Sequence, residues 1–299
     1  MKKEIFRGVG TAIITPFKND EIDYPVLAEL IERQIEAGVG AIVAAGTTGE
    51  AATLTDRERH ELYKFTRKCT AGRVPLILGT GSPDTRRAIE YTRLAREVGA
   101  DGVLVVTPYY NKGTKEGIYR HYLTISEAVD IPIILYNVPS RTGVSLDLDT
   151  LKRLGSLPGI VGIKEAADSA ERLAALSELT GELPLYSGVD ALIYTTLSLG
   201  GSGVISVVSN LYPKETVDIC KHFFANERKK SLKIQHGLAD VINAMFLDTN
   251  PAPIKYAMAR RGLCNPEMRL PMWLPTERCQ RKIDAAIEEY EAKKARGKT

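Results

Sequence analysis

Cysteine, histidine and tryptophan are scarce in this chain of 299 residues, which contains four cysteines, four histidines and one tryptophan. The cysteines form no CxxC pair and have no metal-ligand spacing, which predicts free thiols in a reducing compartment. They are Cys69, Cys220, Cys264 and Cys279. The histidines fall in helical stretches without a ligand-like grouping and are His60, His121, His222 and His236. The sequence therefore predicts no catalytic metal and no other cofactor.

An excess of one charge and long apolar runs are also lacking. The net charge is +3, from 40 basic and 37 acidic residues that are dispersed along the chain, which does not favour a nucleic-acid partner. No run reaches the roughly 20 apolar residues that a membrane-spanning helix needs, and no apolar signal-peptide core precedes Arg7. We therefore expect a cytoplasmic protein with small-molecule partners and neither a nucleic-acid nor a membrane partner.

Short β-branched runs alternate with amphipathic stretches along most of the chain. This alternation is typical of parallel strands joined by crossover helices, and eight such units predict a closed (β/α)8 barrel of the TIM type. The predicted strands are residues 9–16, 41–45, 76–79, 102–107, 133–137, 161–164, 185–187 and 203–207. Barrel active sites lie where the strands end, so we expect functional residues there.

The strand pattern stops after about Ala225, and helical patterns follow around residues 228–247, 253–263 and 277–293. No long linker separates these segments from the barrel. We therefore predict two parts, a barrel over residues 1–225 that carries the active site and a C-terminal helical subdomain over residues 226–299 that packs on it.

The most informative segment is residues 160–165 (IVGIKE), where Lys164 ends an apolar run. Strand alternation predicts that Gly162 and Lys164 share one face, with Val161 and Ile163 on the other. An amine among apolar groups favours its neutral form, which is a nucleophile able to form a Schiff base with a ketone. The alternative is a lysine that reaches solvent at the barrel end or pairs with Glu165.

Other chemically useful side chains follow other strands. Alternation puts Tyr136 on the same face as Ile134, where its phenol is a candidate general acid and base, or else a core aromatic whose hydroxyl bonds to the backbone. Gly46 and Gly49 flank Thr47 and Thr48, which predicts a tight turn that exposes both hydroxyls and backbone N–H groups and is able to bind a carboxylate.

Arg141 follows strand five and offers a planar fork for a second carboxylate, with a surface salt bridge as the alternative.

Together these motifs resemble the dihydrodipicolinate synthase (4-hydroxy-tetrahydrodipicolinate synthase) family, within the pyruvate-dependent class I aldolases that include N-acetylneuraminate lyase. The resemblance spans nearly the whole chain. Its motifs are residues 46–50 (GTTGE), 52–54 (ATL), 107–111 (TPYYN), 136–143 (YNVPSRTG), 162–165 (GIKE), 203–206 (GVIS) and 250–255 (NPAPIK).

The resemblance implies a lyase in lysine and diaminopimelate biosynthesis, in which Lys164 condenses with pyruvate and the enamine attacks L-aspartate 4-semialdehyde. It further implies a proton relay of Tyr136, Thr47 and Tyr110, with Tyr110 reaching into a neighbouring subunit of a homotetramer built from two dimers. Four residues are implied to bind substrate, namely Thr48 at the pyruvate carboxylate, Arg141 at the semialdehyde carboxylate, and Gly188 and Ile205 through backbone groups near the lysine.

The chain departs from the family pattern at two places. Val189 follows Gly188 where the family commonly has an acidic residue. Arg59, Pro83 and Arg87 stand where members inhibited by lysine carry a histidine, an asparagine and a glutamate. Arginines would repel a bound ammonium group, so we expect weak or absent lysine feedback.

Two alternatives remain open from the sequence. Another pyruvate aldolase, such as an N-acetylneuraminate or keto-deoxy sugar acid lyase, would use the same imine with a different aldehyde. A non-catalytic barrel that binds a small acid is the alternative from another class, because folds of this kind host many functions.

Overall fold

The computed structural model describes residues 2, 4–167 and 169–297. Its central feature is a closed barrel of parallel strands in the order β1-β10-β9-β8-β7-β6-β5-β4, which confirms the predicted fold class. The strands are β1 (Gly8–Ala12), β4 (Ala41–Ala44), β5 (Leu76–Gly79), β6 (Gly102–Val106), β7 (Ile133–Asn137), β8 (Ile160–Glu165), β9 (Leu185–Ser187) and β10 (Gly203–Ser206).

The first strand ends earlier than the sequence predicts. Residues 13–16 continue the apolar run, but the Ile14 N–H donates to the side chain of Asn210 (3.1 Å) and not to a neighbouring strand. A short antiparallel hairpin, β2 (Phe17–Lys18) with β3 (Glu21–Ile22), follows and was not predicted. The Ile13 N–H still donates to the Val43 carbonyl of β4 (3.0 Å), and residues 13–16 stay buried beyond the end of β1, so the buried run outlasts the strand.

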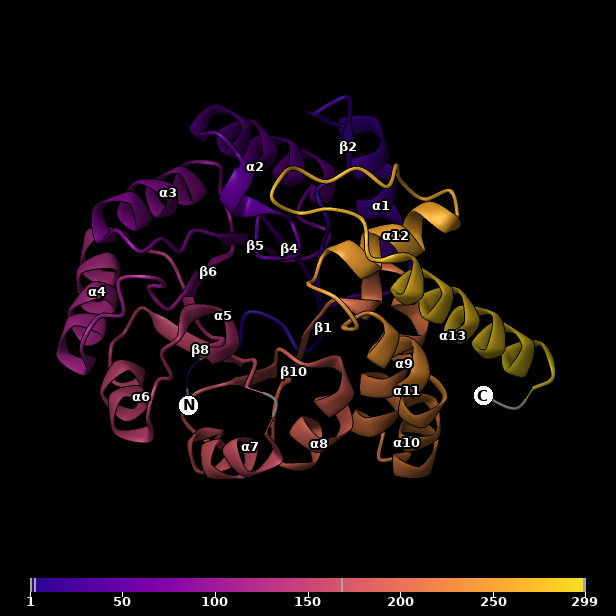
Figure 1. Cartoon of the computed structure of the whole chain (residues 1–299). Coiled ribbons are helices and arrows are strands. Elements are labelled where there is room, and N and C mark those ends of the chain that lie inside the picture. Colours follow the sequence, from indigo (N-terminus) through magenta and orange to yellow (C-terminus); the bar gives the residue numbers. More distant parts are fainter. Residues whose placement is uncertain (1, 3, 168, 298–299) are drawn as a thin grey trace.

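Helices surround the barrel, as Figure 1 shows, because each crossover buries its apolar stripe against the outer faces of the strands. They are α1 (Tyr24–Glu36), α2 (Asp56–Thr70), α3 (Thr85–Glu97), α4 (Lys115–Ala128), α5 (Pro139–Thr142), α6 (Leu148–Gly155), α7 (Ala170–Leu176), α8 (Ile193–Ser198) and α9 (Pro213–Phe224). Thr55 caps α2 in a capping box with Glu58. In the part of the chain that the structure describes, no helix is both long and apolar enough to cross a membrane.

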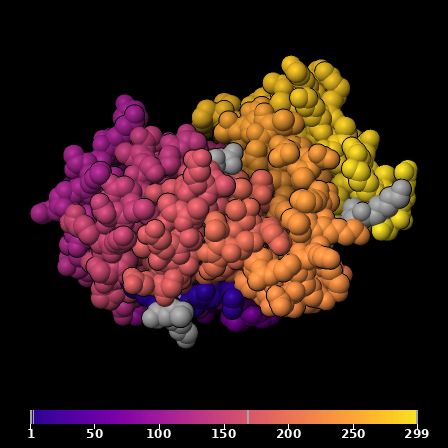
Figure 2. Space-filling model, turned by 90° about the horizontal axis from the view of Figure 1, so that it is seen from below, coloured from indigo at the N-terminus to yellow at the C-terminus, as the bar shows by residue number. Residues whose placement is uncertain are grey.

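Four further helices follow α9 and gather on one side of the barrel (Figure 1). They are α10 (Arg228–Gly237), α11 (Ala239–Ala244), α12 (Ala252–Arg260) and α13 (Glu277–Ala295). α10 packs on α9, and α13 packs on α11 and α12. Figure 2 shows this segment, coloured orange to yellow, as one flank of the molecule. The division of the chain at residue 225 stays a prediction.

Two buried clusters separate the inside of the barrel from its outside. Ile134 and Tyr136 belong to the inner cluster, whereas Ile133 and Leu135 pack outward against the helices, as alternation predicts.

β8 breaks the alternation. Ile133 pairs with Ile160 but Ile134 pairs with Gly162, so Val161 is an extra residue in a bulge. Val161 therefore packs toward the inner cluster, and its predicted outward orientation is wrong. Ile163 lies in the outer cluster, so the next residue, Lys164, points inward.

Candidate active site

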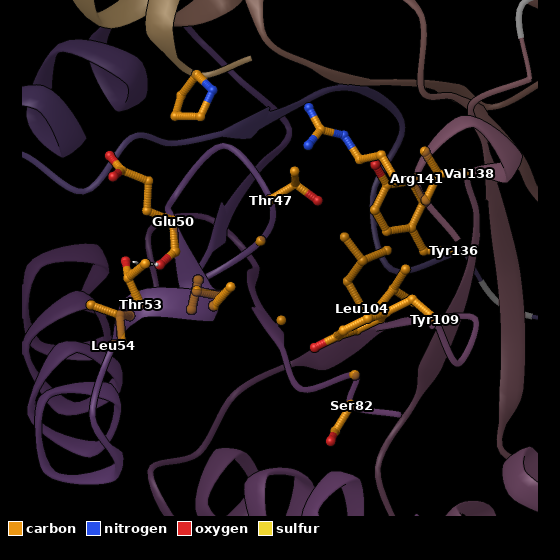
Figure 3. A pocket seen from close by; sticks show the side chains of 18 of the residues that line it. Thr47, Glu50, Thr53, Leu54, Ser82, Leu104, Tyr109, Tyr136, Val138 and Arg141 are labelled. Carbon is orange, nitrogen blue, oxygen red and sulfur yellow. Dashed lines mark hydrogen bonds between the residues drawn. The ribbon is translucent and has the colours of Figure 1, made fainter. Parts of the chain in front are cut away.

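A cavity of about 400 Å³ opens where the strands end. Its walls come from the segments after β4, β5, β6 and β7, and from the C-terminal part of the chain. Figure 3 shows Tyr136 and Arg141 on one side of this space and Glu50, Thr53 and Leu54 on the other, with Thr47 between the two groups. Parallel strands therefore bring residues distant in sequence to one mouth, as the barrel geometry predicts.

Lys164 and Tyr136 are neighbours at this mouth. They pair across β7 and β8, and the Lys164 Nζ lies 4.4 Å from the centroid of the Tyr136 ring. Their exposed fractions are 5% and 6%, so the amine does not extend into bulk solvent. Tyr136 lines the cavity, whereas Lys164 is not among its lining residues and lies against the tyrosine ring. A covered amine beside a phenol fits Schiff-base chemistry.

The alternative pairing of Lys164 with Glu165 is absent among the described contacts. The Glu165 carboxylate accepts hydrogen bonds from Asn137 Nδ2 (2.8 Å), the Ala167 N–H (2.9 Å) and Arg172 Nε (3.1 Å). Strand alternation sends Glu165 outward when Lys164 points inward. The amine is thus left available for chemistry at the barrel mouth.

Gly188 and Asp190 follow β9, and both lie close to the lysine. A Cβ on Gly188 would lie 3.0 Å from the Lys164 Cε and 2.6 Å from the Ala166 Cβ, so only glycine fits. Burial raises the pKa of the Asp190 carboxyl, against the opposing effects of the Ser206 hydroxyl, two backbone N–H groups and the nearby Lys164 amine. Asp190 accepts from Ser206 Oγ (2.5 Å) and from the Val207 N–H (3.0 Å).

The threonine turn, residues 46–50, has the tight geometry that its glycines predict. The Gly49 N–H donates to the Gly46 carbonyl and the Glu50 N–H to the Thr47 carbonyl, both at 3.1 Å. Thr47 is half-buried and lines the cavity. Thr48 is not exposed as predicted, because it is 3% exposed and its Oγ1 accepts a hydrogen bond from Asn250 Nδ2 (3.0 Å). Its own O–H can still donate to a carboxylate.

Arg141 lies in α5, in the cavity wall, with an exposed side chain. Its Nη2 donates to the Asn250 carbonyl (2.9 Å). Among the described residues it forms no salt bridge, so the competing interpretation as a surface ion pair finds no partner. The remaining guanidinium N–H groups are free to bind an anion in the cavity.

Ile205 and Tyr110 occupy opposite extremes of exposure. Ile205 is fully buried in the inner cluster, where its strand β10 pairs with β1. Tyr110 is 93% exposed and adopts a left-handed backbone conformation with φ of 71°. Its neighbour Tyr109 lines the cavity, so the chain brings one tyrosine to this cavity and sends the other away.

Sequence reasoning missed the contribution of the C-terminal segment. Asn250 contacts both Thr48 and Arg141, and Lys255 of α12 forms an ion pair with Glu50 at the end of the threonine turn. Residues 250–255 (NPAPIK) were identified as a family motif without a role for either side chain. Within the described residues, no group of three or more His, Cys, Asp or Glu side chains could hold a metal ion.

A closed barrel that covers a lysine amine beside a tyrosine at the strand ends defines the protein as a lyase of the class I aldolase type. A model of the dihydrodipicolinate synthetase family matches residues 5–290. The chain belongs to this family.

Curated relatives and solved structures that resemble the chain carry the name of the same family. The 4-hydroxy-tetrahydrodipicolinate synthase of Clostridium novyi (strain NT) is 44% identical over 96% of this chain and 97% of that protein. A 4-hydroxy-tetrahydrodipicolinate synthase structure from Methylacidiphilum fumariolicum SolV has a TM-score of 0.95 and 40% identity, covering 97% of both chains. The dihydrodipicolinate synthase of Thermotoga maritima has a TM-score of 0.94 and 40% identity, covering 96% of this chain and 99% of that chain.

Proposed function

We propose that the protein condenses pyruvate with L-aspartate 4-semialdehyde to give 4-hydroxy-tetrahydrodipicolinate, in lysine and diaminopimelate biosynthesis. The single observation that supports this most strongly is the Lys164 amine, covered from solvent and 4.4 Å from the centre of the Tyr136 ring. The relatives named above carry the name of this synthase over nearly their full length. Those names favour the synthase over a sugar acid lyase or a non-catalytic barrel.

The first chemical step forms the imine. The Lys164 nitrogen attacks the pyruvate carbonyl carbon, and proton transfers convert the resulting carbinolamine to an iminium with loss of water. Tyr136 is the general acid and base for these transfers, since its side chain adjoins the amine. Loss of a proton from the pyruvate methyl group then gives the enamine.

The second step forms the carbon-carbon bond. The enamine carbon attacks the aldehyde carbon of aspartate semialdehyde, and the aldehyde oxygen takes up a proton through the relay of Tyr136, Thr47 and Tyr110. The amino group of the semialdehyde then attacks the imine carbon, closes the ring and displaces Lys164. No oxidant or cofactor is required, because every step is an addition, an elimination or a proton transfer.

The two substrate carboxylates are assigned to different groups. Thr48 binds that of pyruvate, since its hydroxyl is oriented by Asn250 and can donate. Arg141 binds that of the semialdehyde from the cavity wall. Gly188 and Ile205 contribute backbone groups next to the lysine, which the position of Gly188 directly after β9 and that of Ile205 on β10 favour.

Tyr110 completes the relay in a neighbouring subunit of a homotetramer. Its 93% exposure and its position next to the cavity-lining Tyr109 support this assignment, because an aromatic side chain so exposed is available to a second copy. A cytoplasmic location accompanies the proposal, in keeping with four cysteines that are free thiols.

The experiment that tests the function compares acceptors. Purified protein and pyruvate are supplied with aspartate semialdehyde or with sugar aldehydes such as N-acetylmannosamine, and product formation is followed. We expect turnover with aspartate semialdehyde only. Turnover with a sugar aldehyde in its place would assign the protein to another pyruvate aldolase, and no turnover with any acceptor would contradict catalysis.

A further inference from the structure

An ion pair shielded from water lies directly behind the threonine turn. Lys255 Nζ of α12 donates to a Glu50 carboxylate oxygen, and the two side chains are 0% and 1% exposed. Removing two charges from water is expensive, and apolar residues of similar volume often serve stability as well or better. A role in fold stability alone therefore does not explain why charges occupy this place.

Glu50 closes the turn that carries Thr47 and Thr48. Its N–H donates to the Thr47 carbonyl (3.1 Å), and its backbone is in the left-handed region with φ of 52°. Few residues other than glycine adopt this conformation, so an additional contact is needed to hold it. The Glu50 carboxylate supplies that contact, because it accepts from Lys255 Nζ and from the Arg269 N–H (3.1 Å).

Lys255 is itself held from sides other than the turn. Its Nζ donates to the Glu267 carbonyl (2.9 Å) and lies 4.3 Å from the centroid of the Phe17 ring. Burial lowers the pKa of Lys255, and the adjacent Glu50 carboxylate opposes that change. The ammonium group is thus held in place by contacts outside the turn, and the turn binds to it through the Glu50 carboxylate.

The same segment holds the other predicted carboxylate-binding groups. Asn250 lies just before α12, and its Nδ2 donates to Thr48 Oγ1 while its carbonyl accepts from Arg141. α12 and the residue two positions before it therefore contact the turn at Glu50, the hydroxyl of Thr48 and the guanidinium of Arg141. These contacts join the C-terminal segment to the barrel mouth at the cavity itself.

We propose that Lys255 is a positioning residue, which fixes Glu50 and thereby orients the threonine turn to receive the carboxylate of the keto acid. The proposal rests on the proposed function, because it assigns the pyruvate carboxylate to Thr48. Lys255 touches neither the substrate nor Lys164. Its effect is on the affinity for pyruvate.

The test uses the double variant Glu50→Gln/Lys255→Met, which removes both charges and keeps the side-chain volumes close to the original. We expect it to fold and to raise the KM for pyruvate about tenfold or more, the usual loss when a hydrogen bond to a charged group is misaligned. The rate of borohydride trapping at saturating pyruvate should remain within about threefold of wild type, since saturation compensates weaker uniform binding.

Two further variants complete the design. Glu50→Gln alone leaves Lys255 bound to the Glu267 carbonyl and the Phe17 ring but without its carboxylate partner, so it should be less stable than the double variant and should raise the pyruvate KM in the same way. Arg260→Met is the matched control, because Arg260 lies on the same helix, is 61% exposed and pairs with Asp284. Its pyruvate KM should equal that of wild type.

An unchanged pyruvate KM in either folded Glu50 variant would overturn the proposal and leave the pair a structural role only. A rise in the pyruvate KM accompanied by an equally large fall in the borohydride-trapping rate at saturating pyruvate would also overturn the proposal. The defect would then lie at the lysine. A wild-type protein that forms no imine with pyruvate is a different result, which contradicts the proposed function itself.

Discussion

The space beside the reactive lysine is tight enough that one methyl group should disturb it. In a Gly188→Ala variant the new Cβ would lie 2.6 Å from the Ala166 Cβ, 3.0 Å from the Glu165 carbonyl oxygen and 3.0 Å from the Lys164 Cε. Carbon atoms in favourable contact are about 3.5–4.0 Å apart. Some atoms must therefore move by about 0.5–1 Å to reach that separation.

The lysine side chain is the neighbour that can move. The Gly188 N–H donates to the Glu165 carbonyl (2.6 Å) and the Ala166 N–H donates to the Asn137 carbonyl (2.9 Å), so both backbone neighbours are fixed by the barrel. A reactive group misplaced by about 1 Å loses about 100-fold in rate. Overpacking of this kind should also lower the free energy of unfolding by about 1–3 kcal/mol.

The assay is the rate at which borohydride traps the pyruvate imine, measured together with thermal unfolding. Gly181→Ala is the matched control, because no heavy atom lies within 4 Å of the Cβ that it would add. We expect about 100-fold slower trapping in Gly188→Ala and no change in the control. Trapping at the wild-type rate in a folded Gly188→Ala protein would refute the idea that Gly188 sets the position of Lys164.

Three further predictions concern the phenol, the effector and the acid response. Tyr136→Phe should retain pyruvate binding but lower kcat about 100-fold to 10,000-fold, because general acid and base catalysis by the phenol is lost. A normal kcat in this variant would exclude Tyr136 as the general acid and base. The free amino acid lysine should not inhibit the enzyme at micromolar concentration. A cation at contact distance from Arg59 or Arg87 is repelled by roughly 4 kcal/mol at an effective dielectric constant of 20. Steady-state inhibition by micromolar lysine would contradict this prediction. Contact with Arg269 lowers the pKa of Glu58 from 4.5 to about 2, so the stability from this pair is complete above about pH 4.5 and is lost toward pH 2. The wild-type protein should therefore have a higher free energy of unfolding than Arg269→Gln, by an amount that becomes smaller between about pH 5 and pH 3 in denaturant titrations. A difference between the two proteins that stays constant with pH would show that the pair does not titrate.

The barrel could be predicted because its signal is local. Short β-branched runs bounded by turns gave all eight strands, and three of them, β5, β7 and β9, have the predicted bounds. Alternation also put Tyr136 on the inner face. These features depend on the period of the strand and on residues close together in the sequence.

The bulge at Val161 could not be predicted, because it arises from the pairing of β8 with β7 and leaves no mark in the spacing of apolar residues. Alternation still gave the correct orientation of Lys164, since Lys164 and its register partner Tyr136 lie beyond the irregular pair. The alternating period alone therefore predicted the correct face of the strand for Lys164 and the wrong face for Val161.

The C-terminal contributions to the site depend on tertiary contacts. Asn250 and Thr48 are 202 positions apart, and Lys255 and Glu50 are 205 apart, so no periodic pattern links them. Burial of Thr48 follows from the same contacts. The assigned roles of the site residues stay predictions, and the lysine itself is the place to test them.

The most direct measurement is mass spectrometry of the peptide that contains Lys164 after treatment with pyruvate and borohydride. We predict that this peptide gains the mass of one reduced pyruvate adduct, and that Lys164→Ala protein gains none. An unmodified Lys164 peptide in active wild-type protein, or an adduct on another lysine, would contradict the central claim.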